Sequence, residues 1–181
     1  ALGRMTPPEQ LATVRPVLED KVEQSEATKN WDEMAAAYRE MLEIWPDDPE
    51  ASEGLVRSIW QKAQAALSGG SDEAAAEREA RALASSLKEL KPLAKRSAAV
   101  PDVFEALGHL SLARAVRLAN TRRLGEAMLM AEQALAACDG WEKALEVKEQ
   151  LSALMNQLRE HVAELKAEVA RRANAQLSPE G

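Results

Sequence analysis

Apolar residues recur every three or four positions along most of this chain of 181 residues, in blocks separated by Pro, Gly and Asn. Such spacing places the apolar residues on one face of an α-helix, and the separating residues are those that end or cap helices. The pattern therefore predicts an all-α protein. The expected helices span about 16–28, 31–45, 49–67, 72–91, 101–120, 123–138 and 141–174.

Several helix boundaries carry specific signals. Asn30 is expected to cap the second helix, because Glu33 follows it at the third position. In the segment WPDDP, Pro46 should close that helix and Pro49 should open the next. Pro16 lacks an N–H group and crowds the preceding turn, so the first helix should kink or restart there.

Three other segments are expected to lie between or before helices. The segment TPPE at 6–9 has the composition of a helix start, with a capping Thr and a Pro in the first helical position. The segment SGGSDE at 68–73 is predicted to be a turn, because two glycines stop one helix and Ser or Asp can cap the next. The segment LAKRSAAV at 93–100 should be a linker.

The helix that ends at Pro46 has counterparts that end at Pro92 and Asp139, with apolar or small residues at matching offsets. The other half of this unit contains the spacing Phe104-x2-Leu107-Gly108-x2-Ser111. That spacing approximates the W-x2-L-G-x2-Y signature of the tetratricopeptide repeat (TPR). The chain therefore resembles a TPR protein over roughly residues 15–140. The resemblance implies a helical solenoid of about three antiparallel helix pairs, with the last helix as a cap.

The repeat period departs from that family. Pro46 and Pro92 are 46 residues apart, and Pro92 and Asp139 are 47 apart, whereas a TPR unit has about 34 residues. The helices or their joints must be longer than usual, and HEAT or armadillo units remain an alternative. The expected organisation is repeats over 1–140, a long capping or coiled-coil-like helix over 141–176 and a disordered tail at 177–181.

In TPR folds the first helix of each pair lines the concave face, so the resemblance also implies a binding groove. The residues expected on it are Glu19, Glu23, Glu26, Glu50, Glu53, Arg57, Trp60, Gln61, Asp102, Glu105, His109 and Leu112. This surface is acidic with an apolar stripe, which suits a basic or amphipathic segment of another protein. It lacks the basic clamp with which some TPR proteins hold the acidic tails of chaperones. Two alternatives stay open: the acids form an ordinary solvated face, and Trp60 belongs to the core.

The last helix carries a heptad seam, with apolar residues at alternating spacings of four and three. The seam consists of Leu151, Met155, Leu158, Val162, Leu165 and Val169. Such a seam can pair with another helix, so a homodimer is the alternative function; it can also cover the last helix pair of the solenoid. We expect residues 141–154 to cap and the rest to project or pair.

Charge and composition narrow the partners. A net charge of −7 and few aromatic residues, 3% of the chain, argue against nucleic acid and anionic membranes as partners. Basic residues gather at two places without aromatic neighbours, Lys88, Lys91, Lys95 and Arg96, and Arg114, Arg117, Arg122 and Arg123. No apolar run is long enough to span a bilayer, and a single cysteine, Cys138, fits a reducing compartment. We expect a soluble, cytoplasmic protein.

Residues suited to catalysis are few. His109 and His161 have no companion at a metal-ligand spacing, and Cys138 lies near a helix C-terminus, where the helix dipole disfavours a thiolate. The two glycines at 69–70 have no preceding strand and no following Lys, so they do not form a phosphate loop. The sequence therefore predicts no enzyme activity, cofactor or metal, and favours a scaffold or adaptor that binds other proteins.

Overall fold

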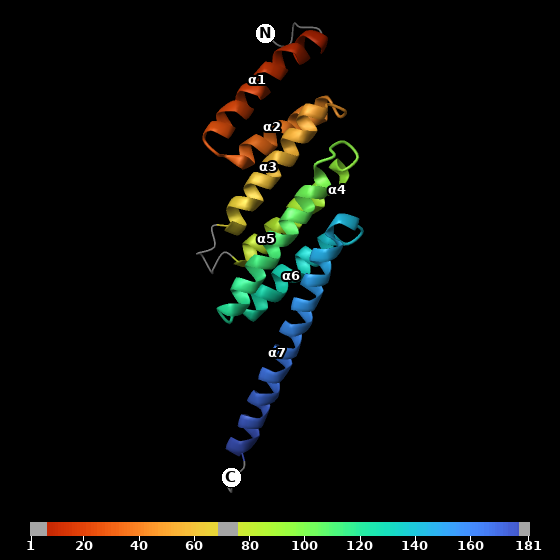
Figure 1. The fold of residues 1–181 in the computed structure, drawn as a ribbon. Coiled ribbons are helices and arrows are strands. Elements are labelled where there is room, and N and C mark those ends of the chain that lie inside the picture. Colours follow the sequence, from red (N-terminus) through yellow and green to blue (C-terminus); the bar gives the residue numbers. More distant parts are fainter. Residues whose placement is uncertain (1–6, 69–75, 178–181) are drawn as a thin grey trace.

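The computed structural model describes residues 7–68 and 76–177, and every regular element in these ranges is a helix. This confirms the expected all-α chain. The elements are α1 (Pro7–Ala27), α2 (Trp31–Ile44), α3 (Pro49–Ser68), α4 (Ala76–Leu93), α5 (Val100–Asn120), α6 (Leu124–Cys138), the short 3-10 helix η3 (Glu142–Ala144) and α7 (Leu145–Leu177) (Figure 1). The capping role expected for Thr6, the glycines at 69–70 and residues 178–181 of the tail lie outside the described residues.

The boundary signals in the first half of the chain succeed at the starts of the first two helices and fail inside the first. Helix α1 begins at Pro7, the first helical position expected from TPPE. The side chain of Asn30 accepts a hydrogen bond from the Glu33 N–H at 3.3 Å, which is the expected cap of α2. The restart expected at Pro16 is wrong, because α1 continues through it from Pro7. Tertiary contacts hold both sides of the proline, with Arg15 bonded to Asp48 and Leu18 buried in the core.

The helices form an elongated stack with the two chain ends at opposite extremes (Figure 1). Each of α1, α3 and α5 packs against the helix that follows it, and α2 packs against α3. Helix α3 also packs on α5, and α5 on α7, so these three helices lie in one row and run in the same direction (Figure 1). Behind them α4 packs on α6, and α6 packs on α7.

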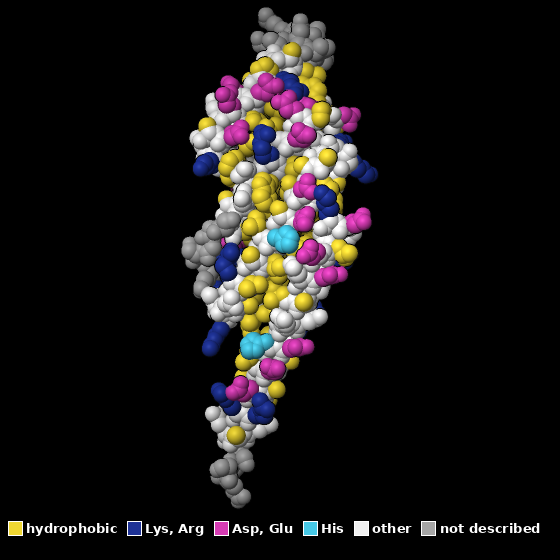
Figure 2. Space-filling view, in the orientation of Figure 1, with side chains coloured by type: hydrophobic (Ala, Val, Ile, Leu, Met, Phe, Trp, Pro, Cys, Tyr) yellow, Lys and Arg dark blue, Asp and Glu magenta, His cyan; other side chains and the backbone are white. Residues whose placement is uncertain are grey.

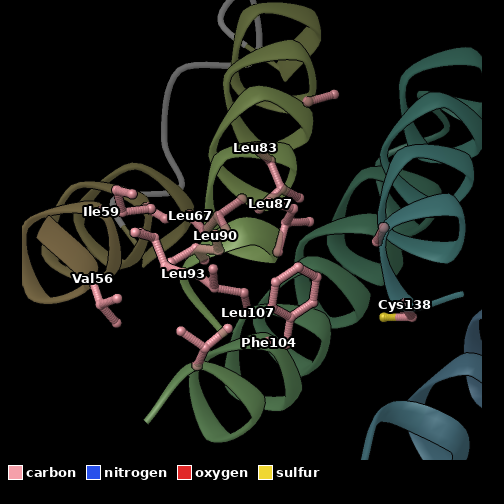
Figure 3. Close-up of a cluster of buried hydrophobic side chains, with 14 of the residues drawn as sticks. Val56, Ile59, Leu67, Leu83, Leu87, Leu90, Leu93, Phe104, Leu107 and Cys138 are labelled. Carbon is pink, nitrogen blue, oxygen red and sulfur yellow. The ribbon is translucent and has the colours of Figure 1, made fainter. Parts of the chain in front are cut away.

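A continuous core runs through this stack from α1 to the first half of α7. Figure 3 shows its centre, where Leu87 of α4 and Phe104 and Leu107 of α5 meet side chains of α3. Helices α4 and α6 pack against each other, and both carry fully buried small residues, such as Ala80 and Ala131. Small side chains allow helices to approach closely, in keeping with the low aromatic content of the sequence.

The start of the last helix is anchored on α5. The rings of Phe104 and Trp141 stack with centroids 4.4 Å apart. Gly108 leaves room for α7, because a Cβ at that position would lie 2.9 Å from Cγ1 of Val147. The long helix is therefore held at its beginning, in the manner of a cap.

Most of the basic cluster around 114–123 is used inside the fold. Arg114 is 2% exposed, and its Nε donates to Oε2 of Glu79 at 3.0 Å. Arg117 donates to the Leu67 carbonyl at 2.7 Å. These two arginines join α5 to α4 and α3, with Arg114 buried and Arg117 still exposed.

Candidate partner-binding groove

A pocket of about 290 Å³ opens where α1 and the start of α3 meet α2. Both α1 and α3 pack against α2, and they make no extended contact with each other. The floor is apolar or aromatic, and the rim is acidic. The lining residues are Arg15, Glu19, Val22, Glu23, Glu26, Tyr38, Met41 and Glu50.

A second hollow of about 470 Å³ continues along the same helix and shares Arg15 and Glu19 with the first. Its other lining residues are Leu11, Ala12, Pro16 and Trp45. We call the two together the α1 trough. Its ends on α1, Leu11 and Glu26, are 15 residues apart, which corresponds to about 22 Å of helix. The trough is long enough for four turns of a partner helix.

Arg15 divides the two hollows and ties α1 to the α2–α3 turn. Its Nη2 donates to Oδ2 of Asp48 at 2.7 Å, and its Nε donates to Oε1 of Glu19 at 3.1 Å. The guanidinium carbon lies 4.9 Å from the centre of the Trp45 ring, within the range of a cation–π contact. The hydrogen bond to Asp48 is the main cause that raises the pKa of Arg15. The segment WPDDP therefore positions α1 as well as ending α2.

Asp48 has a second role in the same turn. Its Oδ1 accepts a hydrogen bond from the Glu50 N–H at 3.1 Å, and its carbonyl accepts one from the Ser52 N–H. These bonds satisfy amide groups in the first turn of α3, which otherwise lack partners. The Glu50 side chain is thereby placed at the rim of the trough.

Tyr38 forms part of the trough floor. Its hydroxyl accepts a hydrogen bond from Nη2 of Arg57 at 3.2 Å, while its ring is packed against α3 at Gly54. Burial raises the pKa of Tyr38, and the nearby Arg57 opposes this by favouring the phenolate. At neutral pH the floor therefore presents a neutral phenol beside the glutamates.

The structure brings together part of the predicted groove. Four of the expected acids line the pocket, Glu19, Glu23, Glu26 and Glu50. Arg57 lies beside them through its bond to Tyr38, and Glu53 is exposed on the same helix. Trp60 and Gln61 are partly buried, and Trp60 packs against the core, as the alternative interpretation expected.

The α5 residues predicted for the groove do not line the trough. Asp102 forms an ion pair with Lys143 of η3. Glu105 lies 4.0 Å from Nε2 of His109. Leu112 is partly buried against the core. The predicted surface therefore divides into a hollow at α1 and a flatter, partly paired region on α5.

Sequence reasoning did not place on the groove the residues that shape the hollow, namely Arg15, Val22, Tyr38 and Met41. The sequence contained one indication of this hollow: Arg15 precedes Glu19 by four residues on a helix, so the two side chains lie on the same side of it. Its partner Asp48 is 33 residues away, and only the packing of α1 on α2 brings them together.

The trough is strongly negative. Four glutamates and one arginine line the deeper pocket, a formal charge of −3. In Figure 2, acidic side chains gather over the upper part of the molecule, where α1 and the start of α3 lie. A column of hydrophobic side chains lies below them. A basic group approaching this end of the molecule is attracted.

The heptad seam of the last helix is buried for half of its length. Leu151, Met155 and Leu158 are at most 4% exposed, so the cap extends one turn beyond the expected limit of residue 154. Val162 is partly buried, whereas Leu165 and Val169 are 41% and 66% exposed. The second half of α7 projects beyond the other helices (Figure 1).

Within 7–68 and 76–177, no three His, Cys, Asp or Glu side chains form a group that could hold a metal ion. No helix in the described part of the chain has both the length and the apolar character needed to cross a bilayer. Cys138 is buried, and burial raises the pKa of its thiol.

No family model, curated protein or solved structure matches this chain. The candidate site therefore rests on the geometry of the chain itself.

Proposed function

We propose that this protein is a non-enzymatic interaction scaffold whose α1 trough binds a basic, amphipathic segment of a partner protein. The observation that carries the proposal is the pocket of about 290 Å³, with four glutamates around a floor of Val22, Tyr38 and Met41. Apolar floors with a charged rim suit amphipathic helices, which bury one face and pair charges at the edge.

The proposed architecture is a TPR-like solenoid with lengthened helices. Its support is the packing of successive helices in pairs and the single row formed by α3, α5 and α7. In such an array each unit contacts mainly its neighbours, and the extended face is used for binding. The trough lies at the first unit, where α1 is packed on one side only, by α2.

Binding would combine charge and burial. The methylene stems of Lys or Arg cover apolar surface while their charged ends remain near carboxylates. Such surface is offered by Leu11, which is 39% exposed, and by the partly buried Trp45 in the second hollow. Val22 and Met41 are at most 9% exposed, and Glu23 and Glu26 lie at the rim. Exposed carboxylates are screened by salt, so affinity should fall as ionic strength rises.

The test uses an 18-residue helical peptide of Lys and Leu with one apolar face, titrated by fluorescence anisotropy against the full chain. Replacing Glu23→Gln and Glu26→Gln together should weaken binding about tenfold, since each rim charge contributes modestly. The control is Glu40→Gln with Glu43→Gln, which changes the net charge equally at two exposed residues of α2 outside the trough. Equal loss in both variants, or none in the first, would refute the trough as the binding site.

The projecting half of α7 supports a second candidate function, a homodimerising assembly element. The supporting observation is the exposure of Leu165 and Val169 in the seam that is buried at Leu158. For this candidate to hold, light scattering must give a dimer and no larger species, and Leu165→Lys must dissociate it. A wild-type chain that remains monomeric at every concentration removes this candidate.

A further inference from the structure

The projecting half of α7 carries an apolar stripe that is exposed at its end in the part of the chain that the structure describes. Val162, Leu165 and Val169 continue the line of Leu151 and Leu158, which is buried against the rest of the stack, and exposure rises along it to 66% at Val169. From Val162 to Leu177 the helix continues for 15 residues, again about 22 Å.

The charges beside this stripe are mostly basic. At 100° per residue, Arg159, Lys166 and Arg172 fall within about 100° of the centre of the stripe, whereas Glu160 and Glu164 fall on the other side. Glu168 lies on the stripe side and is already bonded to Arg172, at 2.7 Å. The stripe side therefore has the chemistry of a basic amphipathic helix.

These flanking charges disfavour the pairing of two seams. In an antiparallel pair, Arg159 of one copy would face Lys166 of the other. Residues at these flanking positions set the orientation and partner of a coiled coil through their charges. The repulsion in the antiparallel pair and the basic side chains along the stripe point to an acidic acceptor instead.

The α1 trough is an acidic acceptor of the same length on the same chain. Its own α7 cannot reach it, because the trough and the projecting end of α7 lie at opposite extremes of the molecule (Figure 1). The α7 of a second molecule can reach this trough, because that molecule is not joined to it through the same chain.

We propose that the projecting half of α7 from one molecule lies in the α1 trough of the next, so that copies join head to tail. The inference rests on the proposed function of the trough and names the partner segment. Leu165 and Val169 would lie over the apolar part of the trough, where Leu11 is 39% exposed beside Trp45. Lys166 and Arg172 would lie near the glutamates of the rim. Because this interface joins two different surfaces, it leads to open chains or closed rings rather than to a two-fold dimer.

The test is sedimentation velocity on the full chain over a wide concentration range, at low and high salt. The wild type should grow beyond a dimer as concentration rises, and high salt should reverse this growth. The trough variant, Glu23→Lys with Glu26→Lys, and the tail variant, Leu165→Ser with Val169→Ser, should each remain monomeric. Circular dichroism of both variants verifies that the helices persist.

Mixing the two variants gives the decisive result. The trough variant has an intact tail and the tail variant has an intact trough, so the mixture should form a 1:1 dimer and grow no further. A trough variant that dimerises alone would show seam-to-seam pairing and overturn the proposal, as would a wild type that stays monomeric.

The peptide titration, run on the tail variant, separates this inference from the proposed function. Peptide binding together with a monomeric wild type would leave the trough as a site for another protein and reject the second copy as its partner. Absence of peptide binding together with a monomeric wild type would reject both the trough as a binding site and the second copy as its partner.

Discussion

Tyr38 lies so close to Gly54 that a Cβ at position 54 would be 2.1 Å from Cζ of the tyrosine ring. No real side chain tolerates such a distance. The glycine therefore lets α2 and α3 approach closely and keeps the ring in the floor of the trough, where its hydroxyl meets Arg57.

Replacing Gly54→Ala should lower the free energy of unfolding by about 1–3 kcal/mol, because the methyl group forces the ring or the helix to move. The ring would be pushed toward the pocket, so peptide binding should change as well. Urea denaturation followed by circular dichroism measures the stability. Gly125→Ala is the control, since a Cβ there meets nothing within 4 Å; it should stabilise by about 0.5–1 kcal/mol.

Arg15→Lys should loosen α1. Lysine keeps the charge but lacks the planar fork that reaches both Asp48 and Glu19 and stacks on Trp45. Amide hydrogen exchange in α1 should accelerate about fivefold, as expected for the loss of about 1 kcal/mol. Lys21→Gln, at an exposed residue of the same helix, should leave exchange unchanged; an equal effect there would contradict the role assigned to Arg15.

The ion pair of Glu79 and Arg114 should be costly to break. Their side chains are 13% and 3% exposed, so Glu79→Ala removes a carboxylate that bonds to a buried guanidinium. The expected loss of stability is about 3 kcal/mol. Glu77→Ala removes the exposed pair with Arg81 on the same helix and should cost less than about 0.5 kcal/mol. Equal losses from the two variants would show that burial of the first pair has little effect.

Cys138 should make stability depend on pH in the alkaline range. Burial raises the pKa of its thiol above the ordinary value of 9.0, so the unfolded chain ionises first as pH rises. The contribution of Cys138 is complete below pH 9 and is lost as pH climbs through the raised pKa. Unfolding of the wild type and of Cys138→Ala, compared between pH 7 and 10, should show a smaller alkaline loss in the variant. Iodoacetamide at pH 8 should label the native wild type slowly, because the side chain is 1% exposed.

The sequence alone determined the helices and most of their ends. The cap at Asn30, the helix start at Pro49 and the end at Cys138 depend on neighbours within a turn, so the pattern of residues predicts them well. Two boundaries were exceptions. Contacts of Arg15 and Leu18 with other parts of the chain keep α1 continuous through Pro16. The last helix begins at Leu145, after the short 3-10 helix, and not at the expected residue 141.

Tertiary packing alone decided where a cavity lies and which charges remain available. The trough exists because α1 and α3 both pack on α2 but make no extended contact with each other. No local pattern of residues encodes the distance between α1 and α3. The same packing buried Arg114, tied Arg117 to a carbonyl and left Val169 in solvent. Local periodicity shows which residues share a helix face, but the position of the next helix decides whether that face is covered, paired or open.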